Sequence, residues 1–301
     1  MKRRSGLVLK IILIGLICLL AGCGGRSGGQ TPDDPDGPKP GDFKSAYFPA
    51  VFDNPEYIAD NVSLDTSTAG DGYVGLSIVN ENNIKIILVS PEKDYVYDVP
   101  HDGTTFYLPL SEGDGDYILR VMQNTTDNRY LELASREIHV EDNDEFDPFV
   151  HPNYYVNFNP EMDCIKKAAE FAAESASDAD FTVKVYDFIK KTVEYDWELA
   201  ATVQSGYVPD PDRTFNSGKG ICFDYASLAA SMLRSQGIPT RLITGYMGNE
   251  ALFHAWNAVY LKEYGWVSVE FKFDRENWNR FDLTLAASNQ STDIYVDSFV
   301  Y

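Results

Sequence analysis

The sequence GKGICFDYASLAASMLRSQGIP, from Gly218 to Pro239, decides how the C-terminal half of the chain folds. Glycines open it, and Gly237 followed by Pro239 gives the ending that helices often have. The residues between are mostly small or apolar and predict a helix that faces a core. Cys222 is then at the helix N-terminus, where unpaired backbone N–H groups and the helix dipole favour an anion. We expect a nucleophilic thiol with a lowered pKa and amides that also hold an oxyanion; a buried structural cysteine is the alternative.

Two strands are predicted after this helix, within residues 241–261. His254 begins the second strand, where it can take the proton of the Cys222 thiol and later protonate a leaving amine. A third group must orient that imidazole. Asp282 lies on a later predicted strand, and Glu270 is the competing carboxylate.

Several blocks of this sequence, in this order, resemble the bacterial transglutaminase-like family. The blocks are GKGIC at 218–222, YA at 225–226, LR at 233–234, GIPTR at 237–241, GY at 245–246, HAWN at 254–257 and WNRFDLT at 278–284. The resemblance covers residues 181–287 and implies a papain-like α+β domain, in which the nucleophile helix packs on an antiparallel sheet. It also implies a thioester with an acyl donor, which an amine or water resolves. By this resemblance Cys222 is the nucleophile, His254 the general base and acid, and Asp282 the residue that orients the imidazole.

Two departures from the family pattern concern the third residue of this set. The usual Asp-Pro-Thr of the family is Asp-Leu-Thr at residues 282–284, and Asp282 follows His254 at a wider spacing than in short members. An added hairpin before Asp282 explains that spacing, and Asp282 is the preferred assignment. If instead the block around Trp266 aligns with the family, Glu270 takes the third position.

The first 22 residues have the composition of a signal peptide. A basic start precedes an apolar run at residues 11–20, which is short for a membrane-spanning helix, and small residues lie directly before Cys23. This pattern resembles the lipobox of bacterial lipoproteins, which implies that Cys23 is lipidated; an ordinary signal peptide with an incidental cysteine is the alternative. Residues 23–42 are mostly Gly, Ser, Pro and Asp and predict a flexible tether. We therefore expect an extracytoplasmic protein that is anchored to the cell membrane as a lipoprotein.

The rest of the chain is predicted to contain two domains. Residues 43–150 carry short runs of β-branched and aromatic residues separated by turn clusters, which is typical of an all-β, immunoglobulin-like sandwich. Residues 151–301 are predicted to form the α+β papain-like transglutaminase domain. This domain begins with helices at 161–174 and 181–192, the second capped by Asp180.

Composition limits the classes of function. The chain has 301 residues, of which 44% are hydrophobic, so it can bury a core. A net charge of −21 with no compensating basic stripe excludes nucleic-acid binding. We expect no cofactor and no bound metal, and Cys164 is predicted to be a small core residue.

The leading hypothesis is a membrane-anchored cysteine acyltransferase or hydrolase. Its substrates would be peptide or isopeptide amides of proteins or peptides at the cell surface or wall. The alternatives are a cysteine peptidase or amidase, and a catalytically silent binding lipoprotein with the same fold.

Overall fold

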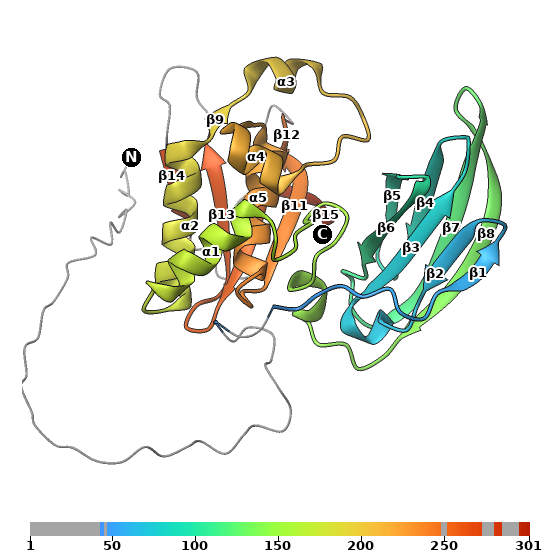
Figure 1. The fold of residues 1–301 in the computed structure, drawn as a ribbon, viewed down its shortest axis with the longest axis horizontal. Coiled ribbons are helices and arrows are strands. Elements are labelled where there is room, and N and C mark those ends of the chain that lie inside the picture. Colours follow the sequence, from blue (N-terminus) through green and yellow to red (C-terminus); the bar gives the residue numbers. More distant parts are fainter. Residues whose placement is uncertain (1–42, 45–46, 248–251, 273–279, 285–294) are drawn as a thin grey trace, which may run out of the picture. The chain divides into compact units, whose positions relative to one another are not determined.

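The computed structural model describes residues 43–44, 47–247, 252–272, 280–284 and 295–301 (Figure 1). The predicted signal peptide, the tether and Cys23 lie outside these residues, so what was expected of them stays a prediction. At Glu270 and Asp282 the structure describes the backbone and not the side chains. Within the described ranges, no helix combines the length and the apolar character that crossing a membrane requires.

The antiparallel strands expected in the N-terminal half are present. They form two sheets, one with the order β1-β2-β3-β6 and the other with the order β5-β4-β7-β8. The elements are β1 (Glu56–Ala59), β2 (Val62–Asp65), a 3₁₀ turn η1 (Ala69–Asp71), β3 (Tyr73–Val79), β4 (Ile84–Val89), β5 (Asp94–Val99), β6 (Asp102–Pro109), β7 (Gly115–Thr126), β8 (Arg129–Val140) and η2 (Asp147–Phe149). Along β4, Ile84, Ile86 and Leu88 are buried at every second position, as a strand with one face on a core requires. Buried residues of both sheets belong to one hydrophobic core; the immunoglobulin-like classification stays a prediction.

Helices and strands mix in the C-terminal half. The elements are α1 (Asp163–Ala173), α2 (Asp178–Thr192), β9 (Glu194–Tyr195), α3 (Trp197–Thr202), α4 (Pro211–Ser217), β10 (Lys219–Gly220), α5 (Cys222–Arg234), β11 (Thr240–Met247), β12 (Leu252–Leu261), β13 (Gly265–Lys272), β14 (Arg280–Thr284) and β15 (Tyr295–Val300). The two helices expected first are present as α1 and α2. The predicted cap of α2 is wrong, because the Ser177 side chain accepts the hydrogen bond from the Asp180 backbone N–H, so Ser177 is the N-cap.

A five-stranded antiparallel sheet forms the centre of this half, with the order β14-β13-β12-β11-β15. Helix α5 packs on β11 and β12 and is covered by α1, α2 and α4 (Figure 1). Every residue from Asp224 to Arg234 is buried, as expected for a helix with protein on all sides. This arrangement is the helix-on-sheet packing that the sequence predicted around Cys222.

Arg234 fixes the C-terminal end of α5. Its fully buried guanidinium donates three hydrogen bonds of 2.8 Å, to the backbone carbonyls of Thr240, His151 and Tyr301. Burial lowers the pKa of Arg234 to about 9, and the three carbonyl dipoles are the hydrogen-bond partners that its charge needs. Because the C-terminal end of α5 is held at the start of β11, its first residue, Cys222, lies toward the opposite end of that strand.

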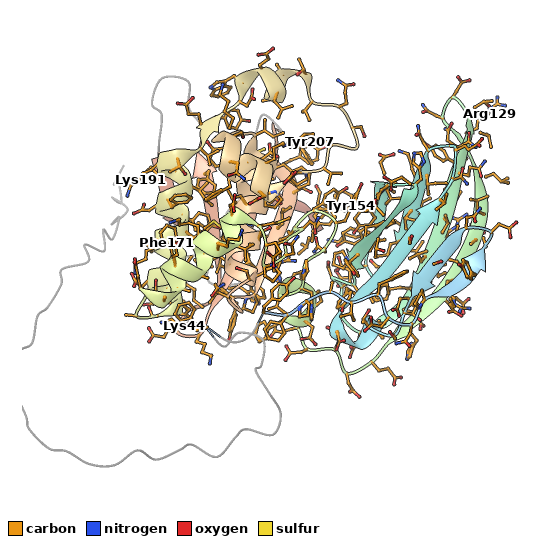
Figure 2. The ribbon with its side chains drawn as sticks, in the orientation of Figure 1. Lys44, Arg129, Tyr154, Phe171, Lys191 and Tyr207 are labelled. Atoms are coloured by element: carbon orange, nitrogen blue, oxygen red, sulfur yellow. The ribbon has the colours of Figure 1, made fainter. Side chains whose placement is uncertain are left out.

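Residues just after position 150 contact the N-terminal sheets. The Tyr154 backbone N–H donates to the Tyr107 carbonyl at 2.9 Å, and its hydroxyl donates to the Asp98 carbonyl at 2.6 Å (Figure 2). Buried residues on both sides of position 150 belong to the same core. The chain is therefore packed continuously across position 150. The domain boundary expected there stays a prediction.

Candidate active site

Cys222 is the first residue of α5, as predicted, and Ile221 is its N-cap. The backbone N–H groups of Ala255 and Phe223 lie close to the thiol sulfur, where they lower the pKa of the thiol. Ala255 belongs to β12, so the helix and the sheet meet at this sulfur. Cys222 is partly exposed, whereas Cys164 is fully buried, and both thiols are free. The prediction that Cys164 is a core residue is confirmed.

The pKa of the Cys222 thiol is raised to about 11, first of all by burial. Part of the residue is accessible, but the sulfur itself is surrounded by protein. The backbone amides act in the opposite direction, and the negative charge of Asp224 adds to the rise. The lowering expected from the helix N-terminus is therefore outweighed. A thiol with this pKa is protonated at neutral pH, so attack on a substrate requires a base.

His254 is supplied by β12, directly before the residue whose N–H meets the sulfur. Its side chain is only 5% exposed. The imidazole lies parallel to the Trp256 ring, with 6.4 Å between centroids and 19° between planes. The strand thus brings the predicted base to the end of the sheet where Cys222 lies, in a position held by an aromatic neighbour.

The two candidate carboxylates occupy one register position. Glu270 on β13 and Asp282 on β14 are Cα partners. The register of these strands therefore favours neither residue as the third group of the site. Strand order does separate them, because β13 is hydrogen-bonded to β12 and β14 lies one strand further away. The ladder between β12 and β13 ends at Asn257 and Val269, one residue before Glu270, and β14 pairs with β13, so the backbone of Asp282 is one strand further from β12 than the backbone of Glu270. Strand order favours Glu270, and the preference for Asp282 stays an untested prediction.

A buried carboxylate that the sequence analysis missed lies two residues after the nucleophile. Asp224 is 1% exposed and accepts hydrogen bonds from the Ile221 backbone N–H at 2.9 Å and from the Tyr207 hydroxyl at 2.7 Å. Tyr207 is labelled in Figure 2, and its hydroxyl accepts a hydrogen bond from the Arg213 guanidinium at 2.6 Å. Burial raises the pKa of Asp224, and these hydrogen bonds oppose that rise. This network fastens the segment between α3 and α4 to the first turn of α5. In the sequence, the signal for this role of Asp224 was an acidic residue at the third position of the predicted helix.

Tyr195 is a second neighbour that the sequence analysis missed. Tyr195 belongs to β9, which pairs in parallel with β10. Strand β10 ends at Gly220, two residues before Cys222. The Tyr195 hydroxyl lies near the Cys222 backbone N–H, and burial raises the pKa of Tyr195 to about 12. The phenol is therefore neutral at working pH.

The described residues contain no group of three or more His, Cys, Asp or Glu side chains placed to hold a metal ion.

A segment of this chain matches the model of a known protein family. The model of the transglutaminase-like superfamily matches residues 165–271, which include Cys222, His254 and Glu270 and end before Asp282. This segment belongs to the transglutaminase-like superfamily. The chain is also 35% identical over 71 residues to a protein-glutamine gamma-glutamyltransferase of Pseudomonas aeruginosa. That match covers 20% of this chain and 11% of the relative, so most of the relative has no counterpart in it.

Solved structures give weaker likenesses to this chain. A candidate cysteine protease of Cytophaga hutchinsonii is 17% identical, with 69% of each chain covered and a TM-score of 0.37. Red sea bream transglutaminase is 14% identical, with 66% of this chain and 47% of that chain covered and a TM-score of 0.28. TM-scores of this size do not establish a shared overall arrangement.

Proposed function

We propose that this protein is a cysteine-dependent enzyme that cleaves or transfers the acyl group of peptide or isopeptide amides through a thioester. The observation that carries the proposal is the meeting of Cys222 and β12. Within the segment that matches the superfamily, the sulfur lies against the Ala255 N–H, next in sequence to His254. Membrane anchoring through Cys23 and an immunoglobulin-like N-terminal domain are parts of the proposal that rest on sequence alone.

The chemistry follows from the groups around the sulfur. His254 takes the thiol proton as the sulfur attacks the carbonyl carbon; a C–S bond forms and the carbonyl electron pair moves to oxygen. Backbone N–H groups in the first turn of α5 and the Tyr195 hydroxyl are the donors near that oxyanion. The C–N bond breaks as His254 passes the proton to the leaving amine. A second amine or water, deprotonated by His254, then attacks the thioester and releases the thiol.

The third group of the proposed site is a carboxylate that orients the imidazole. It is Asp282 by sequence motif and Glu270 by strand order. A carboxylate in this role holds the ring in one tautomer and stabilises the imidazolium that forms during attack. Isosteric substitution of each carboxylate decides between them.

The test is alkylation of Cys222 by iodoacetamide as a function of pH, on the full chain in detergent, with Cys164 as internal reference. A base at the thiol makes Cys222 react below about pH 8. A thiol with a pKa of about 11 and no base would be alkylated much more slowly at that pH. His254→Ala should remove that reactivity, and His139→Ala, at an exposed histidine elsewhere, should keep it. Reaction of Cys222 only at strongly alkaline pH in all three proteins would show that the thiol has no base.

A second candidate is a binding lipoprotein that keeps the fold without catalysis. The raised pKa of Cys222 is the observation that favours it, because a protonated thiol is unreactive. The alkylation profile separates the two candidates. If the protein is an active enzyme, incorporation of a labelled amine into a protein acceptor indicates transamidation. Cleavage of a quenched peptide without amine incorporation indicates a peptidase or amidase.

A further inference from the structure

Two large aromatic side chains are exposed beside each other in the sheet that carries the site. Tyr246 on β11 and Phe253 on β12 are cross-strand partners, with 46% and 54% of their surfaces exposed. Their rings make an edge-to-face contact, with 5.6 Å between centroids and 73° between planes. Such a pair leaves a large apolar area in water, and exposed apolar patches of this kind often mark binding sites.

The register places this pair next to the nucleophile. Thr244 pairs with Ala255, and Tyr246 with Phe253, one alternation further along both strands. Side chains two residues apart on a strand share a face, so Phe253 shares the face of Ala255, and its Cα lies about 7 Å further along.

Helix α5 covers the same face and stops at this point. The Asn257 side-chain amide, two residues beyond Ala255, donates to the Ala226 carbonyl in the second turn of α5 at 3.0 Å. The helix begins at Cys222, whose sulfur meets the Ala255 N–H. Among the residues that the structure describes, Tyr246 and Phe253 therefore lie just past the end of the helix, where α5 no longer covers this face of the sheet. They are exposed because the helix ends at the nucleophile.

We propose that Tyr246 and Phe253 form the acyl-side subsite of the enzyme, which binds a large apolar or aromatic side chain of a polypeptide substrate. The side chain belongs to the residue that Cys222 attacks or to the residue before it. An extended peptide advances about 3.3–3.6 Å per residue, so a side chain within one residue of the attacked carbonyl reaches a platform about 7 Å away. The occupant is the substrate because the platform continues directly from the thiol. This inference rests on the proposed function.

The experiment compares three peptidyl chloromethyl ketones as probes of Cys222 in the full chain. Each probe alkylates the thiolate, forming a thioether and releasing chloride. The probes are acetyl-Phe-Gly-, acetyl-Gly-Phe- and acetyl-Ala-Gly-chloromethyl ketone. Burial of a phenyl ring on the platform should make at least one Phe probe react about tenfold faster than the Ala probe. Equal rates for all three probes in the unmodified protein would overturn the subsite without any variant.

Variants then test whether Tyr246 and Phe253 cause the faster reaction of the Phe probes. The double variant Tyr246→Ser with Phe253→Ser should lose the Phe preference, measured as the ratio of the Phe-probe rate to the Ala-probe rate within the variant itself. Tyr264→Ser and Tyr57→Ser, at residues 55% and 81% exposed elsewhere, are the matched controls and should keep the preference. A Phe preference that survives in the double variant places the apolar contact elsewhere and refutes the assignment.

Iodoacetamide distinguishes failure of the subsite from failure of the function. Rapid alkylation of Cys222 near neutral pH without any Phe preference leaves the enzyme proposal standing and removes the subsite. If Cys222 is as inert as Cys164 toward every reagent, the proposed function fails and the subsite with it.

Discussion

At the scale of single residues, Cys222 experiences opposing influences. Backbone amides stabilise its thiolate, whereas burial and the nearby charge of Asp224 disfavour it, and the net pKa is about 11. The placement at a helix N-terminus was visible in the sequence because Gly218–Gly220 and the apolar run define the helix. The burial that outweighs the helix effect was not visible, since it comes from elements that pack around the sulfur only in the folded chain.

Asp224 gives a prediction about the same thiol. Asp224→Asn removes a negative charge that raises the pKa of Cys222 and keeps an oxygen for the Ile221 N–H. The alkaline midpoint of Cys222 alkylation should therefore shift to lower pH. Loss of the Tyr207 hydrogen bond to a charged acceptor should also destabilise the fold by about 1–3 kcal/mol, measured by urea unfolding.

The matched control for this prediction is Tyr207→Phe. It breaks the same hydrogen bond but leaves the carboxylate charge in place. It should destabilise the protein without moving the alkylation midpoint downward. Identical downward shifts in both variants would mean that loosening of the loop, and not the charge of Asp224, controls the pKa of Cys222.

At the scale of elements, strands separate the two candidate carboxylates. Because β13 lies beside the strand of His254 and β14 lies beyond it, Glu270→Gln should slow alkylation of Cys222 at neutral pH by at least about tenfold. Asp282→Asn should have a smaller effect. Both substitutions are isosteric, so each is the control for the other. The reverse order of effects would restore the assignment from the sequence motif.

The elements themselves were largely predictable, and the sequence signals show why. Helix α5 and strands β11 and β12 have clear punctuation and periodicity. Helix α4 is absent from the elements predicted from the sequence, although Asp210 and Pro211 give it an N-cap and a first turn, because a seven-residue helix has little periodicity to detect. The cap of α2 was misplaced onto Asp180 because Ser177 and Asp180 both suit helix starts, and only the hydrogen bond shows which one caps.

Partners far apart in sequence were beyond prediction. The contact of Tyr195 with Cys222 spans two short strands, and the hydrogen bond from Tyr207 to Asp224 crosses a loop. Neither residue has a local pattern that fixes its partner. The order of β12, β13 and β14 likewise depends on sheet pairing, which explains why the motif around Asp282 could not settle the third group.

At the scale of the whole molecule, His151 links stability to pH. Its Nδ1–H donates to the Pro49 carbonyl at 3.2 Å, and its ring lies 4.8 Å from that of Tyr73 on β3. Its backbone carbonyl accepts from Arg234 at the end of α5. Three distant parts of the chain therefore meet at this residue. Burial, with a smaller contribution from the Arg234 charge, lowers the pKa of His151 to about 4 from an ordinary 6.5.

The sign of the resulting pH dependence follows from this lowered pKa. Between pH 6.5 and about 4 the unfolded chain binds a proton at His151 and the folded protein does not. Stability from this residue is thus complete above pH 6.5 and is lost as the pH falls through that window. Wild-type protein should lose more unfolding free energy between neutral pH and about pH 5 than His151→Gln, which has no proton to bind, in urea titrations at each pH.

His139 supplies the matched control for His151, because its pKa is shifted the other way. It is exposed, and the hydrogen bonds that its ring donates to Glu141 and Asp116 raise its pKa, with Glu141 contributing more. Any stability it contributes is present at low pH and lost as pH rises, so His139→Gln should not flatten the acid-side loss seen in wild type. Carboxylates such as Asp147, whose pKa burial raises to about 6, contribute equally to all three proteins and cancel in the comparison. Parallel curves for wild type and His151→Gln would show that the junction at His151 remains accessible to protons in the folded state.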